Sequence, residues 1–540
     1  MTGRITVDLL DEKLAGPAHT GAASLAGEQV PSKIAAQDPT LWGPEAEHEA
    51  SIRLSWVSLH ESSRPLVDEI VGLRGQLHAE GIDRVVLAGM GGSSLAPEVI
   101  ANTAGVALVV LDTTDPGQVA DALAGDLTRT VLVVSSKSGG TVETDSHRRI
   151  FTSAFEANGI NAASRIVVVT DPGSPLEKTG TDLGYRHVFL ADPHVGGRYS
   201  ALTAFGLVPA GLAGADIGAL LDEAAAAAAV LSQDTDDNPA LVLGAALGEA
   251  HAGGAEKVVL ADTGSGIKGF PDWAEQLIAE STGKNGTGLL PVAVDGPGAP
   301  GFTGAGSDAT PVAIGPAEGP AKISTNGPLG GLFLLWEYAT AVAGRLLGIN
   351  PFDQPDVEAA KIAARSLLDK PAGDGSADTP VAVDGVVEIH ATGDWLPAGT
   401  TTVAEAITAL VQAAPEFGYL AVQVYLDRLD DASAIVLRAE LCRKSGLQTT
   451  FGWGPRFLHS TGQYHKGGHQ NGVFLQITGT PEADLAIPDR PYTLGVLQHA
   501  QAIGDGQVLA DHGRPVLRLH LTDRAAGLAQ VAHAVAEVHR

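Results

Sequence analysis

Short apolar runs alternate with longer segments of mixed polarity in the first part of the chain. The apolar runs are four or five residues long, and the segments between them have apolar residues near helical spacing; the runs lie at 84–88, 107–111, 130–134, 165–169 and 187–190. Continuous apolar runs separated by helices are typical of parallel strands that are covered on both faces. The pattern predicts an α/β fold, with a doubly wound parallel sheet in a first domain over residues 76–232.

A second alternation of the same kind follows. Apolar runs at 257–260 and 289–294 flank a segment with helical spacing at 273–281, which predicts a second domain of the same type over residues 233–370. Before the first sheet, residues 1–75 have apolar residues mainly at helical spacing. We therefore expect an N-terminal helical segment there.

The C-terminal part predicts a further α/β domain over residues 401–540. Its expected strands lie near 419–425, 435–438, 473–477 and 515–519. Residues 371–400 contain Pro-Ala-Gly-Asp-Gly-Ser-Ala-Asp and other polar or small residues, which is typical of a linker.

Composition limits the classes of function. The chain has 540 residues and a formal net charge of -29, and its basic residues are dispersed. Nucleic acids and anionic membranes are bound through basic patches, so we expect neither as a partner. The single cysteine, Cys442, excludes an intrachain disulfide and a cysteine-built metal cluster.

The location of the protein is also predicted. The N-terminus lacks the basic start and apolar core of a signal peptide. The most apolar long stretches, 206–221 and 328–348, contain Asp216 and Glu337 and are interrupted by glycines, which argues against membrane spans. A soluble, cytoplasmic protein is expected.

Two glycine-rich turns follow predicted strands. Residues 135–144, Ser-Ser-Lys-Ser-Gly-Gly-Thr-Val-Glu-Thr, come directly after a buried strand and lead into a predicted helix. The free amides of such a helix start attract anions, and the hydroxyl groups add donors. The turn is therefore interpreted as a phosphate-binding loop; the alternative is an ordinary turn, in which Ser, Thr and Gly are common.

The other glycine-rich turn, which comes first along the chain, is Gly-Met-Gly-Gly-Ser-Ser at 89–94, so that residues 135–144 form the second. It does not match the dinucleotide-binding pattern, because Ser94 stands where glycine is required, and the chain has no nucleotide-binding P-loop motif either. Neither NAD nor ATP is expected, and no cofactor is predicted. Both turns follow strands of the same predicted parallel sheet, whose carboxyl ends form one ligand-binding edge.

Three further motifs make a family resemblance specific. They are Val-Gly-Gly-Arg-Tyr-Ser at 195–200, Glu-Gln-Leu-Ile-Ala-Glu-Ser-Thr-Gly-Lys at 275–284, and Ile-Asn-Pro-Phe-Asp-Gln-Pro-Asp-Val-Glu-Ala-Ala-Lys at 349–361. Together with the two turns, and in this order, they resemble the signature motifs of glucose-6-phosphate isomerases, a family with two sugar-isomerase (SIS) domains. The resemblance covers roughly residues 50–365. It implies interconversion of glucose 6-phosphate and fructose 6-phosphate through a cis-enediol(ate), in glycolysis and gluconeogenesis.

The resemblance also implies roles for individual residues. Glu280 is expected to be the base that moves a proton between C1 and C2, and Arg198 to stabilise negative charge on the intermediate. Lys361 is implied in handling the sugar ring, as the third catalytic residue. The residues expected to bind substrate or its phosphate are Gly92, Ser93, Ser136, Lys137, Ser138, Thr141, Gln276 and Gln354.

Histidine is the main departure from the family. The family has a ring-opening histidine between the glutamate and lysine motifs, whereas this chain has none between His251 and His390. The segment 454–468 contains His459 and His465 and resembles the C-terminal part of isomerases fused to transaldolase. We hypothesise that one of them, with His465 as the candidate catalytic residue, opens the ring; the alternative is a structural contact between domains.

The histidines of this segment also suggest a metal site. His459, His465 and His469 are close in sequence, but Gly467 and Gly468 would interrupt a helix and no glutamate follows His465 as in HExxH. No metal ligand is therefore predicted.

The expected function is that of a glucose-6-phosphate isomerase. Two alternatives remain open, namely an isomerase of another phosphosugar and a non-catalytic sugar-phosphate-binding regulator. The expected partner is a small phosphosugar substrate, and the resemblance implies a homodimer.

Overall fold

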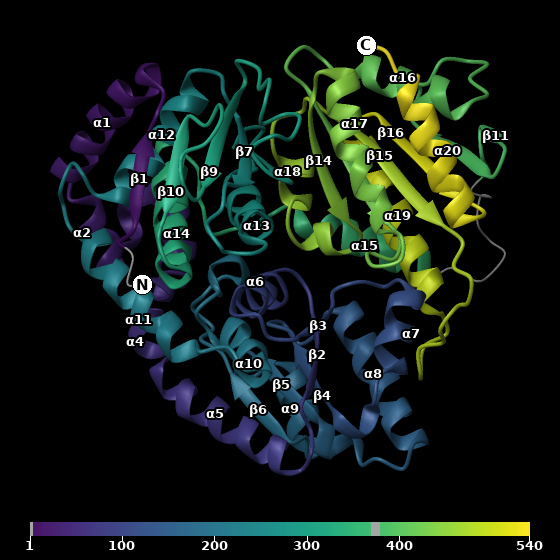
Figure 1. Cartoon of the computed structure of the whole chain (residues 1–540), viewed down its shortest axis with the longest axis horizontal. Helices are drawn as coiled ribbons and strands as arrows, with labels where there is room; N and C mark the ends of the chain where they lie inside the picture. Colours follow the sequence, from purple (N-terminus) through teal and green to yellow (C-terminus); the bar gives the residue numbers. More distant parts are fainter. Residues whose placement is uncertain (1–3, 369–378) are drawn as a thin grey trace.

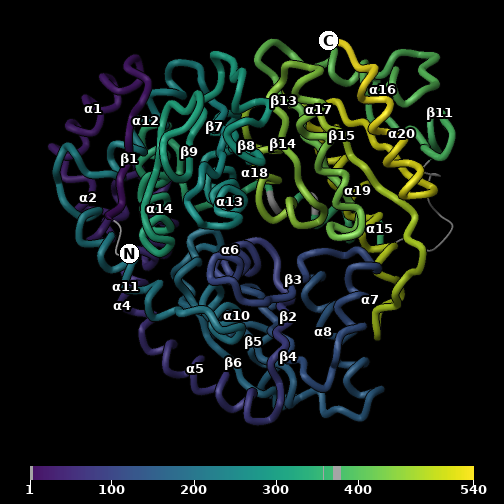
Figure 2. Tube along the Cα trace, viewed as in Figure 1, coloured from purple at the N-terminus to yellow at the C-terminus, as the bar shows by residue number. Residues whose placement is uncertain are grey.

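The fold consists of three α/β units that surround a common centre (Figure 1). The computed structural model describes residues 4–368 and 379–540. Each unit is built on one mainly parallel sheet with helices packed against it, so the predicted α/β class is confirmed. In the view of Figures 1 and 2 the C-terminal unit lies beside the second unit and above the first, and it shares hydrophobic clusters with both.

The first unit contains a five-stranded sheet in the order β3-β2-β4-β5-β6, in which all neighbouring strands are parallel. Its central strands are runs of Val and Leu that are buried on both faces, as expected for a parallel sheet. The strands are β2 Arg84–Gly89, β3 Val109–Leu111, β4 Thr130–Ser135, β5 Ile166–Thr170 and β6 His187–Leu190. The helices are α5 Arg64–Ala79, α6 Leu95–Ala104, α7 Pro116–Ala124, α8 Val142–Ala157, α9 Pro175–Asp182 and α10 Ala204–Ala213, with 3₁₀ turns η3 Gly91–Ser93, η4 Leu127–Arg129, η5 Ala162–Arg165 and η6 Gly197–Tyr199.

The second unit contains a five-stranded sheet in the order β1-β10-β9-β7-β8. Its parallel strands are β7 Lys257–Asp262, β8 Leu290–Val294, β9 Ala309–Ile314 and β10 Ile323–Asn326. Its helices are α11 Ile217–Leu231, α12 Pro239–Ala252, α13 Phe270–Thr282 and α14 Leu329–Leu346. Helix α14 is buried along most of its length, which explains its nearly continuous apolar sequence.

The N-terminal segment is not wholly helical. Strand β1, Thr6–Leu9, pairs antiparallel with β10 at the edge of the second sheet. The segment is mainly helical, as predicted, but strand β1 was not predicted, because four residues are too few to show a pattern by themselves. The helices that follow are α1 Glu12–Gly27, α2 Val30–Ala35, α3 Pro44–Ala50 and α4 Leu59–Ser62, with 3₁₀ turns η1 Pro39–Trp42 and η2 Ser55–Ser58.

The C-terminal unit contains a six-stranded sheet in the order β11-β12-β16-β15-β13-β14. The strands are β11 Ala382–Asp384, β12 Val387–Thr392, β13 Tyr419–Tyr425, β14 Gln448–Trp453, β15 Gly472–Gly479 and β16 Val516–Leu521, of which the last four are parallel. The helices are α15 Val357–Leu368, α16 Val403–Ala413, α17 Val436–Ser445, α18 Gly462–Gly467, α19 Leu494–Asp511 and α20 Arg524–Ala536, with 3₁₀ turns η7 Ala432–Ile435 and η8 Arg456–His459.

Two predictions for this part of the chain are corrected. The prediction of a linker over residues 371–400 is wrong for its second half, because β11 and β12 form a hairpin there and β12 pairs with β16. The start of the predicted linker, up to residue 378, lies outside the described residues. The strand expected at 435–438 is also wrong. Those residues lie at the end of η7 and the start of α17, and the strand in that region is β14. A short apolar run of this kind does not distinguish the two structures.

The C-terminal unit shares hydrophobic cores with both other units. Tyr419, Tyr464 and Phe474 pack with residues of the second sheet, and Leu494 and Leu497 of α19 pack with residues of the first. Such apolar interfaces hold the three units in one arrangement. Within the described residues, no helix is long and apolar enough to cross a membrane.

Candidate active site

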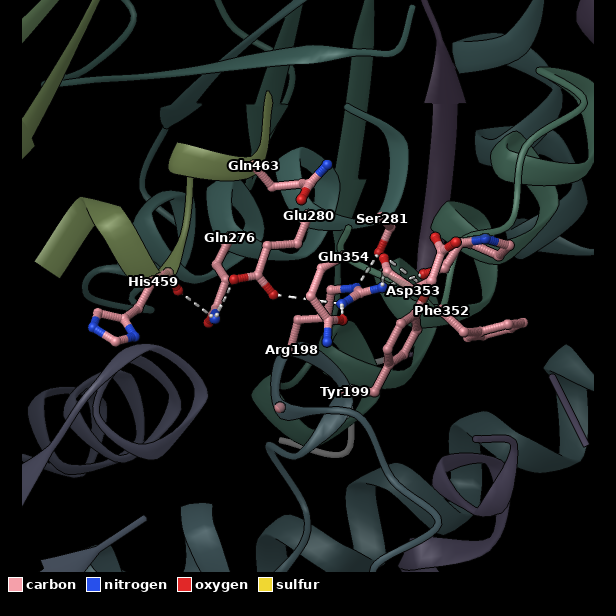
Figure 3. Close-up of polar contacts among 12 residues, drawn as sticks. Arg198, Tyr199, Gln276, Glu280, Ser281, Phe352, Asp353, Gln354, His459 and Gln463 are labelled. Atoms are coloured by element: carbon pink, nitrogen blue, oxygen red, sulfur yellow. Dashed lines mark hydrogen bonds and ion pairs between the residues drawn. The ribbon is translucent and has the colours of Figure 1, made fainter. Parts of the chain in front are cut away.

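Helix α13 supplies two polar side chains to the centre of the molecule. Gln276 and Glu280 are four residues apart, so they lie on the same face of the helix. The Gln276 amide donates to the Glu280 carboxylate at 3.4 Å and to the backbone oxygen of His459 at 2.8 Å (Figure 3). Glu280 is 7% exposed. Gln276 therefore holds the Glu280 carboxylate, and Gln276 itself is held by the backbone of His459 in the C-terminal unit.

Arg198 in η6 lies against Glu280 from the first unit. Its Nη1 is 3.5 Å from Glu280 Oε2 and 2.8 Å from Gln354 Oε1, and its Nε donates to Ser281 Oγ at 2.9 Å (Figure 3). Its Nη2 donates to the backbone oxygens of Pro351 at 2.7 Å and Asp353 at 3.0 Å. All five N–H groups thus have acceptors, and the guanidinium is fixed with its charge beside Glu280.

The ionisation of Glu280 reflects two opposing effects. Burial raises the pKa of its carboxyl above the ordinary value, while the charge of Arg198 and the hydrogen bond from Gln276 act to lower it. Burial is the larger effect. A carboxylate with a raised pKa is a better proton acceptor at neutral pH than an exposed one, which suits a general base.

The first glycine-rich turn approaches this site closely. A Cβ at Gly92 would lie 2.0 Å from the Gly197 carbonyl oxygen, and one at Gly91 would lie 2.6 Å from the His459 carbonyl oxygen. Only glycine permits such approaches of backbone to backbone. The turn therefore joins η3, η6 and η8 at one point, and Ser93 lies within it, 8% exposed.

The second glycine-rich turn closes on itself at the start of α8. The hydroxyls of Ser136 and Thr141 are 2.9 Å apart, and Ser136 Oγ accepts from the Gly139 amide at 3.2 Å. Ser138 Oγ accepts from the Gly140 amide at 3.2 Å. Thr141 is the N-cap residue of α8, but its side chain makes no capping hydrogen bond. The hydroxyls and first-turn amides of a sixteen-residue helix thus lie together, as in an anion-binding loop.

The partners of Lys137 lie outside this hydroxyl cluster. Its Nζ forms an ion pair with Asp171 and donates to the Pro193 oxygen at 3.3 Å. In this structure the charge of Lys137 is therefore neutralised by Asp171 within the fold. The donors available to an anion in this loop are the hydroxyls and the first-turn amides of α8.

The two candidate histidines lie in different environments. His459 Nε2 is 3.1 Å from Glu143 Oε1, and the charge of His459 acts on Glu280. His465 is buried instead, with its ring stacked on Tyr419 and Nδ1 3.1 Å from the Tyr419 hydroxyl. Burial, with the charges of Lys466 and Arg514, holds the pKa of His465 well below the ordinary value.

His465, the histidine predicted to be catalytic, is therefore not among the side chains that contact Glu280 or Arg198. Its side chain belongs to the apolar contact between the C-terminal and second sheets, where it also meets Phe474 edge-on. Sequence spacing could not separate the two histidines, because both lie in the same glycine-rich segment. The third histidine considered for a metal, His469, pairs with Glu256 at 2.9 Å, so the three side chains have three different partners.

Glu143 is a site residue that sequence reasoning did not single out. It lies in the first turn of α8 and accepts from Gln501 Nε2 at 2.8 Å as well as contacting His459. Burial opposes ionisation of this carboxyl, but the charge and hydrogen bond of His459, with a backbone hydrogen bond and the charge of Lys361, together lower the pKa to about 2. The available signal was an acidic residue within the Ser/Thr-rich stretch 135–144, two positions after Thr141.

Lys361 and Gln354 lie at the edge of the site. Lys361 pairs with Glu358 at 2.8 Å, and its charge acts on both Glu143 and Glu280. Gln354 is exposed apart from its contact with Arg198. The predicted residues are thus brought to one region, with Lys137 and His465 turned to other partners.

Lys284 is the last residue of the motif at 275–284, and the sequence predicts no role for it. Its Nζ donates to the Asn350 oxygen at 2.7 Å and to Asp353 Oδ1 at 2.7 Å. Burial, together with the charge of Arg198, lowers the pKa of Lys284 to about 8. Lys284 thereby holds the loop that presents Gln354 to Arg198.

Known proteins resemble parts of this chain. Residues 60–306 match the family model described as phosphoglucose isomerase. A curated glucose-6-phosphate isomerase from Citrifermentans bemidjiense is 36% identical over 210 residues, which are 37% of this chain and 40% of that protein. One from Symbiobacterium thermophilum is 33% identical over 297 residues, covering 44% of this chain and 66% of that protein.

The fold is shared with a solved structure. A hypothetical protein from Thermus thermophilus has 25% sequence identity and a TM-score of 0.57, with 68% of this chain and 100% of that chain covered. The chain spans less than half the length of the first curated relative. The match to the phosphoglucose isomerase model includes the two glycine-rich turns, Arg198 and Glu280 and ends before the C-terminal unit.

Proposed function

We propose that this protein is a glucose-6-phosphate isomerase that uses Glu280 as its general base. The observation that carries the proposal is the buried carboxylate of Glu280 between Arg198 and Gln276, with the His459–Glu143 pair on the neighbouring side. This arrangement combines a base, a fixed positive charge and a second acid-base group. These are the groups that an aldose-ketose isomerisation through an enediolate requires.

The phosphate is proposed to bind at the second glycine-rich turn. Ser136, Ser138 and Thr141 supply hydroxyl donors, and the first-turn amides of α8 add partial positive charge. Neutral donors suit a ligand that must be released. Gly92 and Ser93 of the first turn are proposed to contact the sugar, since a larger residue at position 92 would meet the Gly197 backbone.

Proton transfer is assigned to Glu280. Its carboxylate takes the proton from C2 of open-chain glucose 6-phosphate and returns it to C1, while the hydroxyl proton moves from O2 to O1 of the enediol(ate), which gives fructose 6-phosphate. Arg198 stabilises the negative charge that develops on the enediolate oxygens. Because its five N–H groups already have acceptors, a substrate oxygen would share or replace the Gln354 acceptor on Nη1.

Ring opening is assigned to His459. It can exchange a proton with the ring oxygen or the C1 hydroxyl, and Glu143 orients its imidazole from Nε2. Lys361, whose charge acts on both Glu143 and Glu280, is proposed to assist the same step. The backbone oxygen of His459 holds Gln276, so the ring-opening group and the base are fixed to one another.

The C-terminal unit supplies this histidine within the same chain. Its segment 454–468 resembles the C-terminal part of isomerases fused to transaldolase. A relationship of this chain to those isomerases is therefore also proposed. A homodimer and a role in glycolysis and gluconeogenesis in the cytoplasm are likewise proposed from the family resemblance.

Two other functions make different predictions. An isomerase of another phosphosugar would use the same phosphate loop and base but prefer a different sugar, whereas a regulator would bind without turnover. A coupled assay with fructose 6-phosphate, mannose 6-phosphate and ribose 5-phosphate distinguishes them. Fastest turnover of fructose 6-phosphate is expected; preference for another sugar, or binding without turnover, would contradict the proposal.

A further inference from the structure

We propose that a cavity within the C-terminal unit, apart from the Glu280 site, binds a small uncharged polyhydroxy molecule such as an unphosphorylated sugar. The cavity has a volume of about 330 Å³. It lies at the carboxyl ends of β13 and β15 and beside α19, and its lining includes Tyr425, Thr478, Asp484, Gln498 and His520. None of the residues assigned above to catalysis or phosphate binding lines it.

The topology of the C-terminal sheet places a crevice at this position. After β13 the chain passes through α17 to β14 on one side, whereas after β15 it passes through α19 to β16 on the other side. The order of strands therefore reverses between β13 and β15. In open α/β sheets, ligands bind outside the carboxyl ends of the strands at such a reversal.

The register brings three polar side chains into one row across the crevice. Tyr425 is opposite Thr478, and Thr478 is opposite His520. Thr478 Oγ1 is 2.9 Å from His520 Nδ1, and Thr480 Oγ1 is 3.1 Å from Nε2. The row thus presents a phenol, hydroxyls and an imidazole on the face of the sheet that α19 covers.

Two buried groups of the lining lack hydrogen-bond partners. The hydroxyl of Tyr425, a residue that is 0% exposed, has none, and neither has the amide nitrogen of Gln498, which is 4% exposed. Leaving buried donors and acceptors unpaired is costly. A ligand with hydroxyl groups would satisfy both, since a hydroxyl donates and accepts.

The charges of the lining favour a neutral ligand. Among the described residues that line the cavity there is no lysine or arginine. The carboxylate of Asp484 is already used, because it accepts from the Gly495 amide at 2.9 Å and from the Thr493 hydroxyl. Burial, His499 and Arg518 lower the pKa of His520 to about 4, so its imidazole is neutral at pH 7. A phosphate would find no compensating cation here.

The test is isothermal titration calorimetry of the full chain with D-glucose, D-fructose and sorbitol, with adenosine and inorganic phosphate as comparators. At least one of the three polyhydroxy compounds is expected to bind once per chain. The binding is expected to persist in excess glucose 6-phosphate, because the cavity is separate from the Glu280 site. This result does not depend on whether the chain is an isomerase.

Two variants locate the binding. Gln498→Leu removes the unpaired amide and is expected to weaken binding about fivefold or more. Val496→Trp fills the cavity from its rim, where Val496 is 50% exposed, so the fold and the turnover of fructose 6-phosphate are expected to be unchanged. No binding of the three compounds, binding of adenosine alone, loss of binding in glucose 6-phosphate, or full binding in Val496→Trp would each overturn the proposal.

Discussion

At the scale of single residues, the site depends on charges that are buried in contact with one another. Arg198 and Glu280 are 1% and 7% exposed, and each has a further polar partner, Gln354 and Gln276 respectively. A buried charge is tolerated only when its hydrogen bonds are made. The same rule applies to Glu143, which is held by His459 and Gln501.

Replacing His459 with Asn is expected to make ring opening rate-limiting. The His459 backbone oxygen that holds Gln276 remains in the variant, so proton transfer by Glu280 is retained. The deuterium isotope effect on kcat, measured with glucose 6-phosphate deuterated at C2, should therefore fall towards one. His469→Asn, which removes the exposed contact with Glu256, is the matched control and should leave the effect unchanged. An undiminished isotope effect in His459→Asn would remove this residue from ring opening.

The low pKa of Glu143 predicts a pH-dependent contribution to stability. A carboxyl with a pKa of about 2 in the folded state, against an ordinary value of 4.5, stabilises the fold above about pH 4.5. That contribution, up to about 3 kcal/mol, is lost as the pH falls from 4.5 towards 2. Urea unfolding of the wild type and Glu143→Gln should give free energies that converge over this range. Parallel curves would show that the Glu143 charge does not stabilise the fold.

At the scale of elements, the first glycine-rich turn requires its glycine for packing. A Cβ at Gly92 would lie 2.0 Å from the Gly197 oxygen, whereas one at Gly197 would meet no atom within 4 Å. Gly92→Ala is therefore expected to destabilise the protein by about 1–3 kcal/mol and to displace η6 with Arg198. Thermal unfolding and kcat measured beside the control Gly197→Ala test this. Equal behaviour of the two variants would contradict the close approach.

The sequence was sufficient to predict strands and turns that have a strong pattern within their own residues. The apolar runs of β2 and β4 and the turns after them are recognisable because buried parallel strands and glycine-rich loops have strong patterns. Strand β1 and the β11–β12 hairpin were missed, since short edge strands are defined by their partners. The choice between His459 and His465 likewise depended on how the C-terminal unit docks, which no local pattern contains.

At the scale of the whole molecule, buried ion pairs join the C-terminal unit to the first. Arg456 in η8 contacts Glu98 at 2.6 Å and Asp112 at 3.1 Å. Burial acts to raise the pKa of the Glu98 carboxyl, but the charges and hydrogen bonds of Arg456 and Arg428 lower it to about 2. These contacts lie next to His459, so they position the proposed ring-opening group.

Removing Arg456 is expected to weaken the docking of this unit. Arg456→Met leaves Asp112, which is 1% exposed, without its cation, and should lower the free energy of unfolding by about 3–5 kcal/mol. Denaturant unfolding measures this change. Arg443→Met, which removes an exposed pair with Glu440, is the control and should cost about 1 kcal/mol or less. A change in Arg456→Met no larger than in the control would show that the pairs do not hold the units together.

The most direct test of the account is the conversion of fructose 6-phosphate to glucose 6-phosphate by the wild type and by Glu280→Gln. The substitution nearly keeps the size of the side chain but removes the carboxylate that accepts the proton. The account predicts turnover by the wild type and a loss of at least about 100-fold in kcat for the variant, with substrate still bound. Turnover that survives in Glu280→Gln, or a wild type that binds the phosphosugar without converting it, would contradict Glu280 as the base of an isomerase.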